Sequence, residues 1–322
     1  MVKNLVIDCH ADTLLKKYLE KMIPLLFAER GMEFHVSKDY LTQGGVNIQV
    51  FAIFVLPKLE KIGIDISLEM IALAKEMEKY GFILIKSKND LKKMEETKNK
   101  IGMILSLEGT VALERNLQLL PIFYELGIRN IGLSWSRKNL FCEGTGLTQN
   151  IDESEGLSIH GLELLEQMES LGIVVDVSHL NQKGYTDVVK KSSKPFIASH
   201  SNAYSLCNNN RNLTDEQLME IASADGVVGI NFYPRFLRQN NPDMVSIKDV
   251  IQHIKYIAEL IGVDHVGLGS DFDGIGITPK GLENASKIKK IPHLLKEEGF
   301  TRQDIDKIMG DNFRRVFNMV WK

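Results

Sequence analysis

Short apolar segments rich in β-branched residues alternate with longer amphipathic segments along the whole chain. Repeated strand–helix alternation of this kind is typical of a parallel β-sheet covered by helices. The apolar segments predict eight strands, at 4–9, 46–54, 101–107, 130–135, 172–178, 195–199, 226–232 and 265–270. The first strand is not followed by the Gly-x-Gly-x-x-Gly motif that an open dinucleotide-binding sheet needs. We therefore predict an α/β fold, a closed (β/α)8 barrel of the TIM type.

Polar residues and glycines mark the ends of several predicted helices. Thr214 followed by Gln217 predicts a capping box, in which each side chain hydrogen-bonds the other residue's backbone. Ser246 predicts the start of a helix over 247–261. Another helix is predicted over 110–126, because a glycine follows it and glycine commonly ends a helix. These signals place helices between the strands, as a barrel requires.

The composition is that of an ordinary globular protein. Of the 322 residues, 44 % are hydrophobic and 25 % are charged, and no Pro/Gly/Ser-rich linker divides the chain. Because α/β barrels of about 250 residues or more fold as one unit, we predict a single barrel domain over 1–322. The formal net charge of −3 gives no basis for nucleic-acid binding, so no nucleic-acid partner is expected.

Cysteine usage and the N-terminal sequence bear on the location of the protein. Cys9, Cys142 and Cys207 are odd in number and far apart, which argues against a disulfide framework and favours a reducing compartment. The N-terminus lacks the apolar segment of a secretory signal. The most apolar stretch, 46–56, is shorter than the roughly 20 residues that cross a bilayer. We therefore expect a soluble, cytoplasmic protein with no membrane anchor.

In a β/α barrel the chemistry lies at the C-terminal ends of the strands. His10 and Asp12 end the first strand, and residues two apart share one face of a strand. We expect both to point into the barrel and Ile7 and Cys9 to face the helices. Asp8 is expected to point inward beneath His10, where it either orients a ligand or makes a structural hydrogen bond. An imidazole and a carboxylate at this spacing can bind one metal ion, although His-x-Asp alone occurs by chance in many proteins.

Four further strands also end in polar side chains. Glu108 ends the third strand, where the alternative role is a salt-bridged carboxylate at the rim. His179 and His200 end the fifth and sixth strands; a lone histidine there is more often structural, but two on successive strands indicate a shared site. Asp271 ends the eighth strand, where the alternative is a helix cap or an Asx turn. Together these nitrogen and oxygen donors suit zinc or a similar divalent ion, and two ions fit if Glu108 bridges them.

The strand ends belong to a series of motifs spread over nearly the whole chain. The motifs are Asp8-Cys9-His10-Ala11-Asp12, Gly45-Val46-Asn47-Ile48-Gln49, Ser106-Leu107-Glu108-Gly109, Gly156-Leu157-Ser158, Asp176-Val177-Ser178-His179, Ser199-His200-Ser201 followed by Arg211-Asn212, Gly269-Ser270-Asp271-Phe272-Asp273-Gly274 and Asp311-Asn312-Phe313-Arg314-Arg315-Val316. In this order they resemble the renal-type membrane dipeptidases of the amidohydrolase superfamily.

The resemblance implies a binuclear zinc site. His10 and Asp12 would bind one ion, His179 and His200 would bind the other, and Glu108 would bridge the two. In the family's chemistry, a hydroxide between the ions attacks the peptide bond of a dipeptide. Two zinc ions per chain are therefore expected as the cofactor.

The resemblance also implies roles for residues outside the metal set. Arg211 would receive the C-terminal carboxylate of the substrate, Asp271 would be the catalytic acid and base, and Tyr233 would line the substrate pocket. From the residues alone, a solvated loop arginine is the alternative for Arg211. Trp135 is placed in the substrate site and departs from the renal enzymes, which carry there a histidine that helps stabilise the tetrahedral intermediate. This departure bears on substrate preference.

We therefore predict a zinc-dependent dipeptidase that acts on small dipeptides with a free C-terminal carboxylate; the family adds a homodimer as an expectation. The nearest alternative is another metal-dependent hydrolase on the same barrel, such as a lactonase, a phosphotriesterase-like enzyme or a deaminase. Glu108 argues against it, because many of those enzymes have a carboxylated lysine at that strand, and so does Arg211. A non-catalytic barrel that serves as a scaffold is a more distant alternative, since it has no need of a full set of metal ligands.

Overall fold

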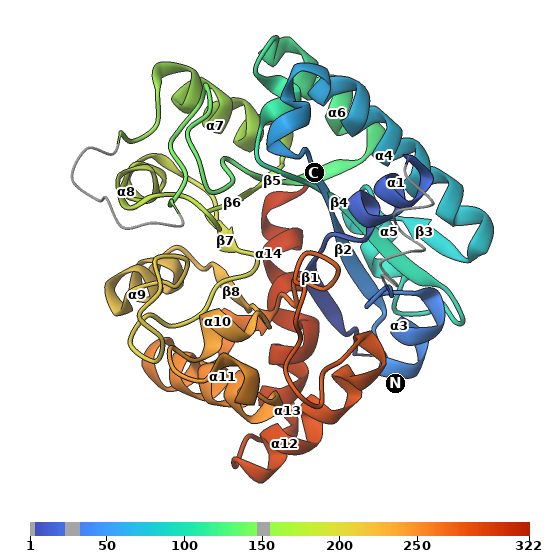
Figure 1. Cartoon of the computed structure of the whole chain (residues 1–322), viewed down its shortest axis with the longest axis vertical. Helices are drawn as coiled ribbons and strands as arrows, with labels where there is room; N and C mark the ends of the chain where they lie inside the picture. Colours follow the sequence, from blue (N-terminus) through green and yellow to red (C-terminus); the bar gives the residue numbers. More distant parts are fainter. Residues whose placement is uncertain (1–3, 23–32, 147–154) are drawn as a thin grey trace.

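The computed structural model describes residues 4–22, 33–146 and 155–322. Its strands pair in parallel, and eight of them close into a barrel, because β1 pairs with β2 and β9 while β2 also pairs with β4 (Figure 1). The strands are β1 (Ile7–Ala11), β2 (Ile48–Phe54), β3 (Phe82–Leu84), β4 (Ile101–Glu108), β5 (Ile128–Gly132), β6 (Val174–Asp176), β7 (Ile197–Ala198), β8 (Val227–Ile230) and β9 (Val266–Leu268). The predicted barrel is confirmed, and each predicted strand overlaps one barrel strand.

One strand, β3, was not predicted. It pairs with Ile101–Met103 at the start of β4, whereas β5 pairs with β4 from Leu105 onward. β3 therefore extends the sheet beside β4 without entering the closed ring. Three residues after a helix end are too few to show the period of a strand.

The helices surround the barrel on its outer side, apart from the last one, which crosses the ring of strands (Figure 1). They are α1 (Thr13–Met22), α3 (Lys38–Gly44), α4 (Gly63–Met77), α5 (Lys88–Lys93), α6 (Leu120–Leu126), α7 (Ile159–Leu171), α8 (Gln182–Lys191), α9 (Asp215–Ser223), α10 (Pro234–Leu237), α11 (Ile247–Ile261), α12 (Ile291–Glu297), α13 (Arg302–Asp306) and α14 (Asn312–Val320). Short 3-10 helices connect several of them.

The helix-end signals are mostly confirmed. α9 begins with the predicted capping box at Thr214, and Ser246 caps α11. The predicted helix over 110–126 is wrong in its first part, where the structure has 3-10 turns and α6 begins only at Leu120. Pro121 explains the difference, because proline lacks the backbone donor that a helix interior needs but fits the first turn.

Buried side chains form two clusters, one on each side of the strands. The outer cluster includes Met103 and Leu105 of β4 and packs under α4, α7, α9 and α11. The inner cluster joins residues from the first parts of β1, β2, β4, β6, β7 and β8 to Phe313, Phe317 and Trp321. These aromatic residues come from α14 and the residue after it, and Figure 1 shows α14 crossing the middle of the strand ring. α14 therefore closes the N-terminal end of the barrel and leaves the C-terminal end open for a site.

The side-chain directions predicted for β1 are wrong before His10. Ile7 and Cys9 belong to the inner cluster. Asp8 lies outside the metal set, and its carboxylate accepts hydrogen bonds from the amide and hydroxyl groups of Ser270, at 2.8 and 2.6 Å. The cause is a register shift between Asp8 and Ala11, which changes the side of the strand on which the following residues lie.

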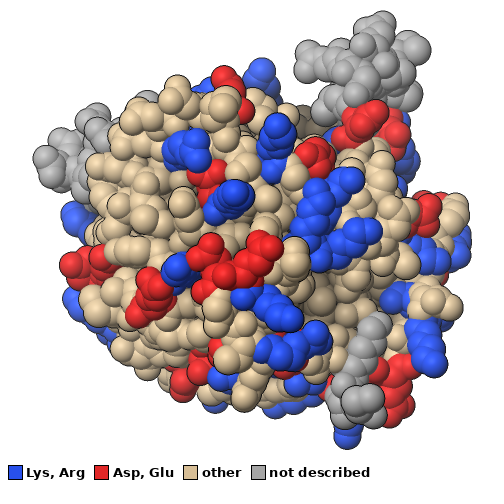
Figure 2. All heavy atoms as spheres, turned by 90° about the horizontal axis from the view of Figure 1, so that it is seen from below, with Lys and Arg blue, Asp and Glu red and all other residues tan. Residues whose placement is uncertain are grey.

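On the face seen in Figure 2, acidic and basic side chains lie beside one another. Among the residues that the structure describes, no helix is long and apolar enough to cross a bilayer.

Candidate metal centre

The C-terminal ends of five barrel strands bring the predicted ligands and the predicted catalytic acid together. β1 and β4 position their residues directly, whereas the loops after β6, β7 and β9 position the others. All are buried except Asp271, which is partly exposed. The residues that meet at this rim are His10, Asp12, Glu108, His179, His200 and Asp271.

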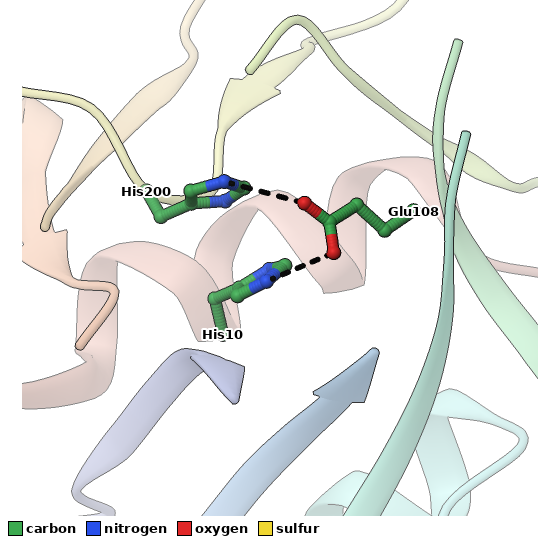
Figure 3. Close-up of side chains that lie close together, drawn as sticks. All are labelled: His10, Glu108 and His200. Atoms are coloured by element: carbon green, nitrogen blue, oxygen red, sulfur yellow. Dashed lines mark ion pairs between the residues drawn. The ribbon is translucent and has the colours of Figure 1, made fainter. Parts of the chain in front are cut away.

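Glu108 lies at the middle of this group. Its Oε2 atom is 3.6 Å from His10 Nε2, whereas its Oε1 atom is 3.0 Å from His179 Nε2 and 3.8 Å from His200 Nε2. Figure 3 shows that His10 and His200 approach different oxygens of the carboxylate. Glu108 can therefore offer one oxygen to each of two groups of donors.

The first group contains His10, Asp12 and Asp271. His10 Nε2 lies 3.5 Å from Asp12 Oδ2, and one donor atom from each of the three residues lies within 4.8 Å of the other two. One donor atom from each of His10, Glu108 and His200 likewise lies within 4.8 Å of the other two. The second group is the pair His179 and His200, whose Nε2 atoms are 2.9 Å apart.

Unpartnered donor atoms indicate that these residues fit a metal. In the described part of the chain, His10 Nε2 and Asp12 Oδ1 are buried and make no hydrogen bond. A buried polar atom without a partner costs about 1–3 kcal/mol, and a bound cation would supply the partner. The facing Nε2 atoms of His179 and His200 would likewise converge on a cation. Nitrogen and oxygen donors in this combination suit Zn²⁺.

Hydroxyl groups contact the far side of two of the imidazole rings. His179 Nδ1 is 2.9 Å from Ser136 Oγ, and His200 Nδ1 is 2.7 Å from Ser199 Oγ. In each ring the Nε2 atom is left to face Glu108. Partners of this kind orient metal-binding histidines.

Two of the gathered residues have a left-handed backbone. The φ angle is 69° at His179 and 61° at Asp271, a conformation that costs non-glycine residues of the order of 1–3 kcal/mol. His179 lies in the short loop that follows β6, and Asp271 lies in the one that follows β9. Gly274 closes the second loop, and a Cβ atom there would overlap the carboxylates of Asp12 and Asp271.

The crowding of charges shifts several pKa values. Burial raises the pKa of Asp271 to about 7, and the carboxylates of Asp12 and Glu108 push it the same way. Burial lowers the pKa of His200 to well below its usual value, as does the neighbouring His10. Asp271 thus holds a proton more readily than an ordinary carboxyl group does, and the His200 imidazole is favoured in its neutral form.

Arg211 is buried beside the second group. Its Nη2 atom donates to the carbonyl oxygen of His200 at 3.3 Å, and its guanidinium lies 5.6 Å from the centre of the Phe236 ring. Burial lowers its pKa to about 10, so it stays charged. Among the described residues, no carboxylate lies within ion-pair distance of it, and its Nε atom has no partner. A buried cation in this state can receive an anion.

A cavity of about 400 Å³ connects Arg211 with His179, one of the candidate metal ligands. His179 and Arg211 both line it, together with polar side chains that include Ser136, Thr145 and Gln182. This volume lies in the range of small-molecule sites. The candidate metal centre and the candidate anion site therefore open on the same space.

Trp135 and Tyr233 lie at the edges of the group. The centre of the Trp135 ring is 5.9 Å from that of the His179 ring, so Trp135 lies beside the candidate metal centre. The Tyr233 ring packs edge-on against the Phe236 ring, with the ring centres 4.9 Å apart, and Arg211 lies over the same Phe236 ring. Tyr233 is thus placed one ring away from the anion site.

Asn231 was missed in the sequence. Its Nδ2 atom donates to Asp271 Oδ2 at 2.9 Å, and its Oδ1 atom accepts from the amide of Tyr233 at 2.6 Å. It follows β8 directly, and a polar residue at the end of a barrel strand was the available signal. Asn231 holds the carboxylate of Asp271 in place.

Comparison with known proteins decides the family. The family model described as membrane dipeptidase (peptidase family M19) matches residues 1–322. The chain belongs to the membrane dipeptidase family. The resemblance seen in the sequence is confirmed, and a metal ion is required for activity in this family of metallopeptidases.

Individual relatives of this M19 chain agree with the family. An uncharacterised dipeptidase of Schizosaccharomyces pombe is 32 % identical over 97 % of the chain and 79 % of its own length. A metallopeptidase of Rhodobacter sphaeroides, solved with a phosphinate mimic of the dipeptide L-Ala-D-Ala, superposes with a TM-score of 0.89 at 28 % identity, covering 99 % of this chain and 100 % of that one. A second M19 dipeptidase structure gives the same TM-score and identity, with 100 % and 99 % coverage.

Proposed function

We propose that this M19 chain is a binuclear zinc dipeptidase that hydrolyses dipeptides with a free C-terminal carboxylate. The observation that carries the proposal is the position of Glu108, whose two oxygens face separate groups of donors beside a buried, unpaired Arg211. His10 and Asp12 would hold one ion, His179 and His200 the other. When bound, the two ions activate a water and polarise the peptide carbonyl.

Asp271 would move the proton that the reaction requires. Its carboxylate lies beside His10 and Asp12 and is held by Asn231 at 2.9 Å. A carboxylate in this position would accept a proton from the attacking water and give it to the departing amine. The second donor group lacks a side chain that could take this role, because its members are both imidazoles turned toward Glu108.

Arg211 would select the substrate. A guanidinium binds a carboxylate through two parallel hydrogen bonds, and the one buried in this cavity lies close to the metal ligands. A carboxylate held there leaves room for only one residue beyond the bond that is cut. This is the reason for proposing a dipeptidase and not an endopeptidase.

The test compares dipeptides with the same dipeptides carrying a C-terminal amide, using zinc-loaded protein. The panel includes D-residues at the second position, because the related Rhodobacter sphaeroides enzyme binds a mimic of L-Ala-D-Ala. We expect the wild type to cleave the acids and not the amides. Arg211→Ala should lose about 2–5 kcal/mol of transition-state binding for the acids only, with unchanged zinc content.

Arg137→Ala is the matched control, because Arg137 lines the same cavity but is paired with Glu60. It should retain the preference for the free acid. Equal cleavage of acids and amides by the wild type would remove the role of Arg211. Activity on lactones or phosphotriesters alone would overturn the dipeptidase proposal and favour another amidohydrolase chemistry.

A further inference from the structure

A buried carboxylate that the proposed reaction does not use lies beneath His200. Asp176 ends β6, and its side chain accepts every hydrogen bond that it makes. Its Oδ1 atom accepts from the amides of Ser178 and Ser199, each at 2.9 Å, and its Oδ2 atom accepts from the Ser199 hydroxyl at 2.5 Å. An ionised carboxylate can only accept hydrogen bonds, so it suits a place where all its neighbours are donors.

The Ser199 hydroxyl connects this carboxylate to the metal centre. Its oxygen is 2.5 Å from Asp176 Oδ2 and 2.7 Å from His200 Nδ1. A hydroxyl has one proton, and an ionised carboxylate can only accept it, so the proton points to Asp176. The oxygen then presents a lone pair to His200, and the Nδ1 atom must carry the ring proton. The lone pair of His200 is left on Nε2, which lies 2.9 Å from His179 Nε2 and 3.8 Å from Glu108 Oε1.

We propose that Asp176, acting through Ser199, fixes the tautomer of His200 in which Nε2 is free to bind a metal. Asp176 is a positioning residue in this scheme, since it touches neither the metal position nor the cavity. The metal-binding part of the inference rests on the proposed function, whereas the tautomer is a property of the chain itself.

The other two histidines lack this arrangement. His179 Nδ1 meets the hydroxyl of Ser136, and no carboxylate in the described residues is hydrogen-bonded to that hydroxyl. His10 Nδ1 has no hydrogen-bond partner among them. The direction of the hydroxyl proton is therefore set by a carboxylate only at His200, which provides an internal comparison.

Asp176→Asn should reverse the chain of hydrogen bonds with little change of shape. The amide oxygen can still accept from the Ser178 and Ser199 amides, whereas the opposite orientation would set an NH₂ group against those two donors. The amide nitrogen must then donate to the Ser199 oxygen. The Ser199 proton turns to His200 Nδ1, and the ring proton moves to Nε2, where it blocks the metal position.

The experiment reads the ring protons by ¹⁵N NMR in metal-free protein with labelled histidine, at pH 8, where ordinary imidazoles with a pKa near 6.5 are neutral. His200 should carry its proton on Nδ1 in the wild type and on Nε2 in Asp176→Asn. Ser136→Ala is the matched control and should leave the His200 tautomer unchanged. Titration with Zn²⁺ alone should show about 10–100-fold weaker binding in Asp176→Asn, the usual effect of losing such a partner.

Ser199→Ala gives an independent answer, including the case in which Asp176→Asn does not fold. Without the hydroxyl, His200 should show a mixture of both tautomers, and Zn²⁺ binding should weaken about 10-fold or more. A wild-type His200 with its proton on Nε2 would overturn the proposal. So would weaker Zn²⁺ binding in these variants with an unchanged tautomer, because that result means a merely structural role. The tautomer is read without metal or substrate. A negative result for it can therefore be told apart from a failure of the proposed dipeptidase function.

Discussion

The two halves of the candidate metal centre are built in different ways. In the half formed by His10, Asp12 and Asp271, the strand end and a tight loop place the donors, and His10 Nδ1 has no hydrogen-bond partner among the described residues. In the half formed by His179 and His200, neighbouring hydroxyls hold both rings. Hydroxyl groups at Nδ1 thus orient both rings of the second half, whereas in the first half Asp271 is held by Asn231 and His10 Nδ1 has no such partner.

The halves also differ in charge and in neighbours. The first half is acidic and includes Asp271, whose pKa burial raises to about 7. The second half lies beside the cationic Arg211, which donates to the His200 carbonyl. In the proposed reaction, proton transfer belongs to the first half and recognition of the substrate carboxylate to the second. Glu108 faces both halves, with one carboxylate oxygen toward each.

Removal of Glu108's charge should have the largest effect, because it acts on both halves at once. In Glu108→Gln only one of the two side-chain positions keeps an oxygen, so we expect the zinc content to fall below two per chain. The loss of several kcal/mol of transition-state stabilisation lowers kcat on the order of 10³-fold or more. Chelation of the wild type should have the same effect, with activity restored by zinc.

Glu114→Gln is the control for this variant, since that carboxylate lies in the loop after the same strand and accepts from the Leu140 amide at 3.4 Å. It should keep its zinc and its activity. Wild-type zinc content in Glu108→Gln, measured by elemental analysis, would show that Glu108 does not join the halves.

Asp271→Asn should affect chemistry in the first half without affecting its metal. An amide cannot carry the proton, so we expect kcat to fall about 10²–10⁴-fold. His10, Asp12 and Glu108 remain, so the zinc content should stay at the wild-type value. If zinc is lost together with activity, Asp271 is a ligand and the assignment as a proton carrier is wrong.

Gly274→Ala should weaken only the first half. The added Cβ overlaps the carboxylates of Asp12 and Asp271, and displacing them costs about 1–3 kcal/mol, which lowers Zn²⁺ affinity at one of two sites about 5–150-fold. Gly276→Ala is the control, because a Cβ there meets nothing within 4 Å. Equal weakening of both sites in a Zn²⁺ titration would refute the division of the centre into halves.

Ser136→Ala should give the smallest effect and act on the second half alone. The His179 ring loses its hydroxyl partner at 2.9 Å, and we expect about 10-fold weaker Zn²⁺ binding at one site. Competition with a chromophoric chelator would measure this change. Weaker binding at the other site instead would show that His179 does not belong to the second half.

The sequence was informative about the barrel and the residues at its rim, because functional residues in this fold lie at the C-terminal ends of the strands. It was uninformative where the alternation of buried and exposed residues is interrupted, or where a segment is too short to show one. Ile7 and Cys9 face inward, and a register shift in β1 between Asp8 and Ala11 lets His10 still reach the site; alternation alone cannot show such a shift. β3 is too short to have a pattern, and Pro121 was the signal that the helix predicted over 110–126 begins only at about that proline.

The supporting residues of the site were not visible in the same way. Asp176 and Ser199 stand in motifs that were noted for their histidines, but only the distances to His200 Nδ1 show what they do. Arg211 lies in an asparagine-rich loop typical of the surface, yet it is only 4 % exposed. Burial and hydrogen-bond direction depend on tertiary packing, which a single sequence does not state.

Anomalous scattering at the zinc edge from crystals of the zinc-loaded protein is the most direct test of the binuclear centre. Two peaks about 3.5–4 Å apart are expected, one between His10 and Asp12 and one between His179 and His200, with Glu108 contacting both. A single peak, or peaks that Glu108 does not contact, would contradict the proposal.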